Sequence, residues 1–180
     1  MLNCGIMSLG VDYMLKSAVG DIKTIIYNDK TSLIKRDSHK FLVIYGATGN
    51  GKSMVSTLKM IKRIFQAKVH EKNFILAGKD ITTLEKRFIN SDYSVLNWRP
   101  FKGKWVYKKQ GVGGAKVIFK TKTGDKYLYL TPFNNKDAYS SILGNTLNGV
   151  FVDEAVEADD LFLQEIVSRV NRTDGTWAIF

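Results

Sequence analysis

The feature that most constrains this chain of 180 residues is a glycine-rich segment of eight, Gly46-Ala47-Thr48-Gly49-Asn50-Gly51-Lys52-Ser53. It matches the pattern G-x-x-x-x-G-K-[ST] and lies between an apolar, β-rich run at 41–45 and an amphipathic pattern at 53–68. Glycines let the backbone curl so that successive N–H groups point at phosphate oxygens, and a following helix adds the positive end of its dipole. The segment therefore predicts a strand, a phosphate-binding loop and a helix, in that order.

Two side chains at the end of this loop have predicted chemical roles. Lys52 is expected to reach the β- and γ-phosphates of a nucleotide, and the Ser53 hydroxyl is expected to bind Mg²⁺. All eight residues of the segment are predicted to contact the nucleotide.

The helix after the loop is predicted to be amphipathic. Its apolar face is formed by residues at helical spacing: Met54, Leu58, Ile61 and Phe65. Its basic residues are predicted to lie elsewhere around the axis: Lys59, Lys62, Arg63 and Lys68.

A pair of acids follows a second apolar run, at 149–152. Asp153 is predicted to hold Mg²⁺ beside Ser53, and Glu154 to act as the general base that polarises the attacking water. In isolation such acids can equally cap the next helix.

The GTPase patterns D-x-x-G and N-K-x-D do not occur; Asn135-Lys136-Asp137-Ala138 is one residue out of register. Loop and acids together favour an ATPase that activates water, with Lys52 and Glu154 as its catalytic side chains.

The rest of the chain alternates between strand and helix patterns. Further strands are expected at 74–77, 149–152 and from 177, with helices from an Asp80 cap to about residue 89 and near 161–170. Three β-rich runs separated by glycine-containing turns predict a small antiparallel meander: 105–109, 116–120 and 127–130. The pattern predicts an α/β domain with a mainly parallel sheet flanked by helices.

Composition narrows the class of protein. Apolar residues make up 44% of the chain, and the single cysteine, Cys4, excludes an internal disulfide. The sequence contains neither a basic signal-peptide start nor an apolar run of about 18 residues, so we expect a soluble intracellular protein.

The basic charge of the chain is concentrated in its first part. Residues 1–110 hold 20 Lys and Arg against 8 Asp and Glu, whereas residues 111–180 hold 7 against 9. This asymmetry suggests a polyanionic partner, with solvated surface lysines as the alternative. In the segment 101–109, lysines interleave with aromatic residues, which suits either a DNA surface or a hairpin whose aromatic side chains face the core.

Several stretches resemble the N-terminal ATPase region of the large terminase subunit of tailed bacteriophages. The resemblance covers about residues 41–180. Four stretches carry it: VIYGATGNGKS, FILAGKDITTLEKRF, SSILGNTLNGVFVDEA and EIVSRVNRTDGTWAIF. The most specific of them is SSILGNTLNGVFVDEA. The loop and the Asp-Glu pair then match the Walker A and Walker B motifs of that family.

The resemblance implies a RecA-like P-loop ATPase that uses ATP and Mg²⁺. It also implies a homo-oligomeric ring at the procapsid portal in the host cytoplasm, with double-stranded DNA, the portal protein and the small terminase subunit as partners. Residues 1–40 are expected to pack on an ATPase domain at 41–180. The family's C-terminal nuclease, and the part that joins it, are expected to lie outside these 180 residues, so no DNA cleavage is predicted for them.

Two alternative functions are open: another nucleic-acid-dependent ATPase, such as a helicase, or a nucleotide-binding assembly fragment without hydrolysis of its own. An arginine that neutralises the transferred phosphate is also expected, in cis or from a neighbour. Four arginines are candidates for it: Arg36, Arg87, Arg169 and Arg172.

Overall fold

The computed structural model describes residues 4–9, 34, 36–46, 51–92, 94–111, 113–134, 146–172 and 175–180. The loop residues Ala47, Thr48, Gly49 and Asn50 lie outside this set. The described elements are β1 (Cys4–Leu9), β2 (Phe41–Gly46), α2 (Lys52–Gln66), β3 (Asn73–Gly78), α3 (Ile81–Leu84), η1 (Glu85–Ile89), η2 (Val95–Asn97), β4 (Trp105–Lys108), β5 (Lys116–Thr121), β6 (Gly124–Pro132), β7 (Gly149–Val152), η3 (Ala155–Glu157), α5 (Asp160–Arg172) and β8 (Trp177–Ile179).

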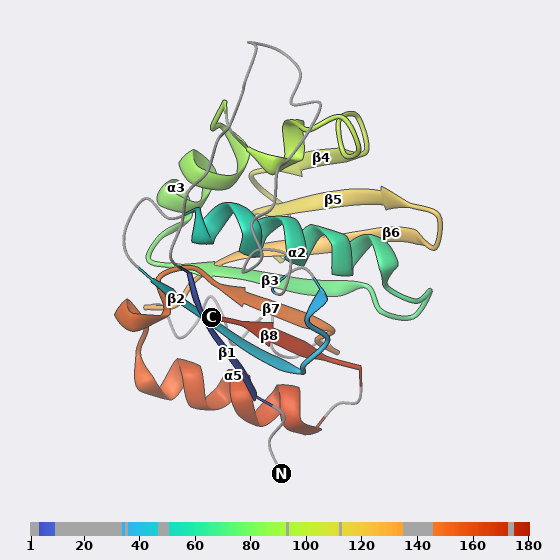
Figure 1. The fold of residues 1–180 in the computed structure, drawn as a ribbon. Helices are drawn as coiled ribbons and strands as arrows, with labels where there is room; N and C mark the ends of the chain where they lie inside the picture. Colours follow the sequence, from blue (N-terminus) through green and yellow to red (C-terminus); the bar gives the residue numbers. More distant parts are fainter. Residues whose placement is uncertain are drawn as a thin grey trace.

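The described strands form one eight-stranded sheet at the centre of the molecule, in the order β1-β2-β8-β7-β3-β6-β5-β4 (Figure 1). The strands from β1 to β6 in this order run parallel, β5 is antiparallel to β6, and β4 is antiparallel to β5. From β2 the chain passes through α2 to β3, so two strands, β8 and β7, separate the strand before the phosphate loop from β3. The predicted mainly parallel α/β sheet is confirmed.

The predicted antiparallel meander is part of this same sheet. β6 pairs in parallel with β3 along its length, from Asn73 opposite Tyr127 to Gly78 opposite Pro132. The hairpin therefore extends the central sheet at one edge.

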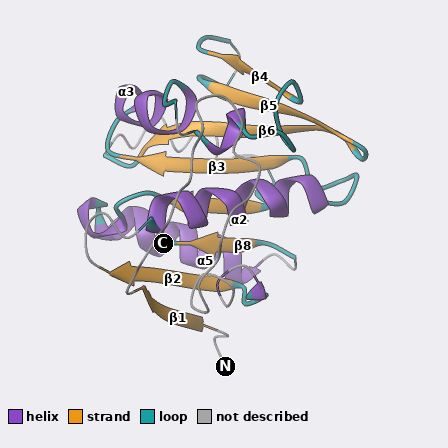
Figure 2. Ribbon diagram, turned by 45° about the horizontal axis from the view of Figure 1, so that its top comes forward, coloured by secondary structure: helices purple, strands orange, loops and turns teal. Residues whose placement is uncertain are grey.

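Helices cover both faces of the sheet (Figure 2). On one face α2, α3 and η1 pack over a core that includes Leu42, Leu76 and Phe151, and on the other face α5 packs its Phe162 and Ile166 over the second core. Consecutive residues of β3 and β7 contribute to opposite cores because strand side chains alternate between faces. Within the described residues, no helix is long and apolar enough to cross a membrane.

The helix α2 corrects one expectation from the sequence. Three of the predicted apolar residues, Met54, Leu58 and Phe65, are only partly buried, although they pack against the core. Lys59, expected on a polar face, is 5% exposed because residues preceding β2 cover it and supply backbone carbonyls to its ammonium group. Helical periodicity alone does not detect such a distant polar partner. The buried positions of the helix are Val55, Ser56, Thr57, Lys59, Met60, Ile61 and Ile64.

Asp80 caps the helix after β3, as predicted. Its carboxylate accepts hydrogen bonds from the backbone N–H of Thr83 at 2.7 Å and from the Thr83 hydroxyl at 2.8 Å. After one turn, α3 widens into the π-helical turn η1, which ends before Asn90. This change in winding was not expected from the sequence, and π-turns occur often at functional sites.

The glycine at the start of β7 has a packing reason. A Cβ atom at Gly149 would lie 2.3 Å from the ring of Trp177 on the neighbouring strand β8. Trp177 itself stacks on Phe74, at 6.0 Å between ring centroids. Gly149 therefore lets an indole ring lie flat against the strand that leads to the acid pair.

The aromatic residues of the segment 101–109 face inward and its lysines face solvent. Phe101 is buried, Trp105 and Tyr107 are partly buried, and the lysines at 102, 104, 108 and 109 are exposed. This arrangement is the one expected of a hairpin whose aromatic side chains face the core.

The first 40 residues contribute β1, which pairs with β2 from Cys4 opposite Phe41 to Leu9 opposite Gly46. Ile34 is buried in the core beneath α2. The division of the chain at residue 40 stays a prediction.

Candidate functional site

A cavity of about 730 Å³ lies at the carboxyl ends of β2 and β7. In parallel α/β sheets, ligands bind outside the carboxyl ends of the strands. Its wall includes the two residues predicted from the phosphate loop, Lys52 and Ser53, and the two predicted acids, Asp153 and Glu154. Residues separated by about a hundred positions in the sequence therefore surround one space.

The loop enters α2 through a left-handed glycine. Gly51 has φ of 66°, a conformation that glycine adopts without steric cost, and its carbonyl accepts the hydrogen bond from the Val55 N–H. Lys52 is the first residue of the helix, and no acidic side chain lies in its first turn. The positive end of the α2 dipole therefore faces the cavity without a helix acid to neutralise it.

Asp153 directly follows β7 and is held deep in the fold. Its N–H donates to the Ala77 carbonyl at 2.9 Å, and its side chain is only 7% exposed. Burial raises the pKa of the Asp153 carboxyl above its usual value, while hydrogen bonding to Arg87 acts in the opposite direction. A neighbouring cation is what such a buried carboxylate requires to stay ionised.

Glu154 has the left-handed backbone that is rare for residues other than glycine. Its φ is 55° and its ψ is 50°, and no other non-glycine residue in the described part of the chain has a positive φ. Placing a residue with a Cβ atom there costs about 1–2 kcal/mol. A strained residue of this kind is typical of functional sites, since the surrounding fold must enforce it.

Arg87 bridges the two acids. Its Nη1 lies 2.7 Å from Oδ2 of Asp153, and its Nη2 lies 2.8 Å from Oε1 of Glu154. These bonds, first to Glu154 and then to Asp153, raise the pKa of the guanidinium. From the sequence, Arg87 was one of four candidate arginines; only the strand order, with β3 next to β7, distinguishes it.

The other three candidates lie away from the acids. Arg36 lines a different cavity, Arg169 pairs with Glu165 at 2.6 Å within α5, and Arg172 is exposed at the end of that helix.

The donor set suits a magnesium ion. Mg²⁺ prefers oxygen ligands and keeps several waters, so that one or two protein ligands with nucleotide phosphates suffice. Ser53 offers a hydroxyl and Asp153 a carboxylate to the same cavity. Among the residues that the structure describes, no group of three or more His, Cys, Asp or Glu could hold a metal by itself.

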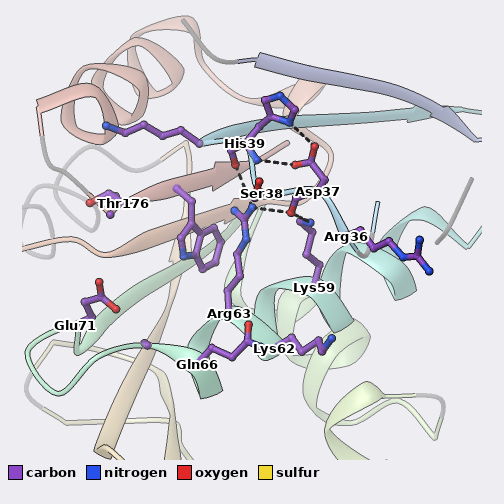
Figure 3. A pocket seen from close by; sticks show the side chains of 14 residues that line it. Arg36, Asp37, Ser38, His39, Lys59, Lys62, Arg63, Gln66, Glu71 and Thr176 are labelled. Atoms are coloured by element: carbon purple, nitrogen blue, oxygen red, sulfur yellow. Dashed lines mark hydrogen bonds and ion pairs between the residues drawn. The ribbon is translucent and has the colours of Figure 1, made fainter. Parts of the chain in front are cut away.

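A second cavity, of about 590 Å³, lies at the opposite end of α2 (Figure 3). Five cationic side chains line it: Arg36, Lys40, Lys59, Lys62 and Arg63. By charge alone it would be the stronger candidate for an anion.

In this second cavity, backbone carbonyls accept hydrogen bonds from Lys59 and from Nη2 of Arg63, whereas the buried Nη1 of Arg63 has no hydrogen-bond partner among the described residues. Lys59 Nζ donates to the carbonyls of Ile34 and Asp37, each at 2.5 Å. Arg63 donates to the carbonyls of Asp37 and His39 and lies 5.1 Å from the ring centre of Trp177 (Figure 3). These cations fasten the segment before β2 to α2.

The comparisons with known proteins agree with this fold. Neither a protein-family model nor a curated protein sequence matches the chain. Among solved structures, the chain is similar to the large terminase of a thermophilic bacteriophage, with a TM-score of 0.65 and 21% identity over 86% of this chain and 38% of that one. The structure of the same protein in complex with ADP has a TM-score of 0.63 and 23% identity, over 86% of this chain and 38% of that one. Its complex with ATP-gamma-S has a TM-score of 0.62 and 21% identity, over 86% of this chain and 37% of that one.

These matches confirm the resemblance to large terminase as a likeness of fold, the mainly parallel α/β sheet flanked by helices that was predicted from the sequence. The chain spans less than two fifths of the length of the matched terminase. The chemical roles of the loop and acid residues stay predictions.

Proposed function

We propose that this chain is the ATPase part of a terminase-like motor, which hydrolyses ATP to move double-stranded DNA into a phage procapsid. One observation carries the proposal: Lys52 and Ser53 share a cavity with Asp153 and Glu154, at the carboxyl edge of a sheet that resembles a terminase crystallised with nucleotides.

The nucleotide binds with its phosphates at the start of α2. The N-terminal end of the helix and the backbone of residues 46–53 attract the phosphate oxygens, and Lys52 supplies the positive charge at the β- and γ-phosphates. Ser53 and Asp153 would hold a magnesium ion, which would screen the negative charge of the phosphates when bound.

Glu154 accepts the proton of the attacking water. The water attacks the γ-phosphorus in line with the bond to the β-phosphate, the proton moves to the Glu154 carboxylate, and ADP and phosphate form. The side chain of Glu154 is 42% exposed, so a water can reach it from solvent. Its strained backbone aims the carboxylate away from the direction that an extended strand would give it.

The DNA partner follows from charge and from the terminase likeness. A translocating motor must bind every sequence equally, so its contacts are to phosphates and weaken as salt rises. The excess of Lys and Arg in residues 1–110 suits such contacts. A ring of copies at the procapsid portal in the host cytoplasm, with portal protein and small terminase subunit as partners, completes the proposal.

The substitution Glu154→Gln tests the assignment of the general base. It preserves size and hydrogen bonding but removes the proton acceptor, so we expect ATP binding to persist while steady-state phosphate release falls by about 100-fold or more. Glu165→Gln is the matched control, because Glu165 is a half-exposed acid on α5, outside the cavity.

Normal turnover in Glu154→Gln would refute the role of Glu154. If the unaltered chain binds ATP without hydrolysing it at any concentration, the nucleotide-binding assembly alternative is favoured. Unwinding of duplex DNA would favour the helicase alternative.

A further inference from the structure

The side chain of Arg87 forms ion pairs with both acids of the proposed ATPase site in this structure. Each terminal nitrogen of its guanidinium contacts one carboxylate, at 2.7 Å for Asp153 and 2.8 Å for Glu154. Charge-assisted contacts of this length are the strong class of hydrogen bond. One oxygen of each carboxylate, Oδ2 of Asp153 and Oε1 of Glu154, is therefore already engaged by Arg87.

The backbone that carries Arg87 is fixed relative to the acids. The next residue, Phe88, is buried and packs edge-on against Phe151 of β7, with ring centroids 5.8 Å apart at 87°. Phe151 lies two positions before Asp153. The π-turn η1 thus anchors the base of the arginine beside the strand that leads to the acid pair.

The far end of Arg87 is free to leave. The side chain is 42% exposed and its stem is long and flexible, so the guanidinium can swing into solvent without disturbing the Phe88 anchor. Asp153, in contrast, is almost fully buried, so a cation that takes the place of the guanidinium keeps a positive charge beside it.

We propose that Arg87 is a positioning residue that keeps the acid pair closed to metal until a divalent cation, arriving with the nucleotide, displaces its guanidinium. This inference rests on the proposed function. Arg87 and the cation compete for the same two carboxylates, so Arg87 sets the cation concentration at which the site fills. With the cation bound, Glu154 is released from Arg87 and becomes available to the attacking water.

The test measures cation binding directly, with Mn²⁺ as a paramagnetic probe of oxygen ligands and no nucleotide present. Removing a positive charge next to the site lowers the Mn²⁺ concentration at half-saturation, by about tenfold for Arg87→Gln. Arg87→Lys keeps the charge but reaches one acid at a time, so its Mn²⁺ midpoint should fall between those of the wild type and Arg87→Gln. Lys86→Gln is the matched control, because it removes an exposed charge from the same turn, and we expect a change of less than about twofold.

The competition would be overturned if Arg87→Gln, with the native circular dichroism spectrum retained, showed no saturable Mn²⁺ binding or showed a midpoint equal to or above that of the wild type. Persistence of the Mn²⁺ signal in Asp153→Asn would also overturn it, since the ion would then sit elsewhere. If Arg87→Gln does not fold, the intermediate midpoint of Arg87→Lys carries the test, and a wild-type midpoint there overturns the proposal.

A second readout separates this inference from the proposed function. The Mg²⁺ concentration that gives half-maximal ATPγS affinity should fall in Arg87→Gln in parallel with the Mn²⁺ midpoint. Loss of ATPγS binding by the unaltered chain would remove the ATPase proposal, whereas the Mn²⁺ titration would still decide the competition.

Discussion

The two ends of α2 carry cavities of similar size and different use. At its start, Lys52 and Ser53 face the acid pair across a space at the carboxyl edge of the sheet. At its end, five cations surround a space at the opposite edge, but the buried ones donate to backbone carbonyls. The number of positive charges therefore does not identify an anion site. An anion site is identified by its position at the carboxyl ends of parallel strands, together with a helix N-terminus.

Left-handed backbone positions repeat the contrast. Beside the second cavity the position with φ of 77° is Gly175, the residue type that adopts this conformation without cost. At the first cavity two positions are left-handed: Gly51, with φ of 66°, and Glu154, with φ of 55°. The molecule accepts backbone strain at Glu154, where a carboxylate serves the proposed chemistry.

The largest expected effect contrasts two lysines of α2. Lys52→Ala removes the charge predicted to contact the phosphates, so we expect ATPγS to bind about 100-fold more weakly by calorimetry, which corresponds to about 2.7 kcal/mol. Lys62→Ala removes an exposed lysine near the second cavity and should change affinity less than about twofold. Equal losses in the two variants would mean that nucleotide binds by general charge.

An effect of intermediate size concerns Lys59, which is buried among cations. Burial first, and then the charge of Arg63, lower its pKa from 10.5 to about 8. Below about pH 8 Lys59 is charged in both the folded and unfolded states; between about pH 8 and 10.5 the unfolded state binds more protons, so stability rises with pH there. Relative to Lys59→Met, the free energy of unfolding of the wild type should rise by about 2 kcal/mol from pH 7 to pH 10.

Urea denaturation of both proteins at each pH measures this difference. The carbonyls left without a donor in Lys59→Met contribute a constant offset, so only the slope with pH is diagnostic. A difference that stays flat would show that Lys59 is as solvated as an ordinary surface lysine.

The smallest expected effect measures backbone strain at Glu154 and Gly175. Glu154→Gly and Glu154→Ala both lose the contact with Arg87, but only alanine keeps a Cβ atom, so the glycine variant should be more stable by about 1 kcal/mol. Gly175→Ala should lose about the same amount relative to wild type. Thermal unfolding of the three variants checks this, and an alanine variant at 154 as stable as the glycine variant would remove the argument from strain.

The sequence by itself determined the elements whose signal is local. The β-rich run and the amphipathic helix are β2 and α2, and the Asp80 cap and the apolar run before Asp153 are found where they were expected. Each of these depends on hydrogen bonds and side-chain spacing within a few residues, which a sequence displays directly.

Only the tertiary structure decided which distant groups meet. Strand order brings β3 beside β7 and so brings Arg87 onto the acids, and it joins the hairpin to the main sheet through β6. The burial of Lys59 depends on carbonyls more than twenty residues earlier. Such contacts arise from the packing of whole elements, and side-chain periodicity, which reports only the face of one element, contains no information about the partner that will cover it.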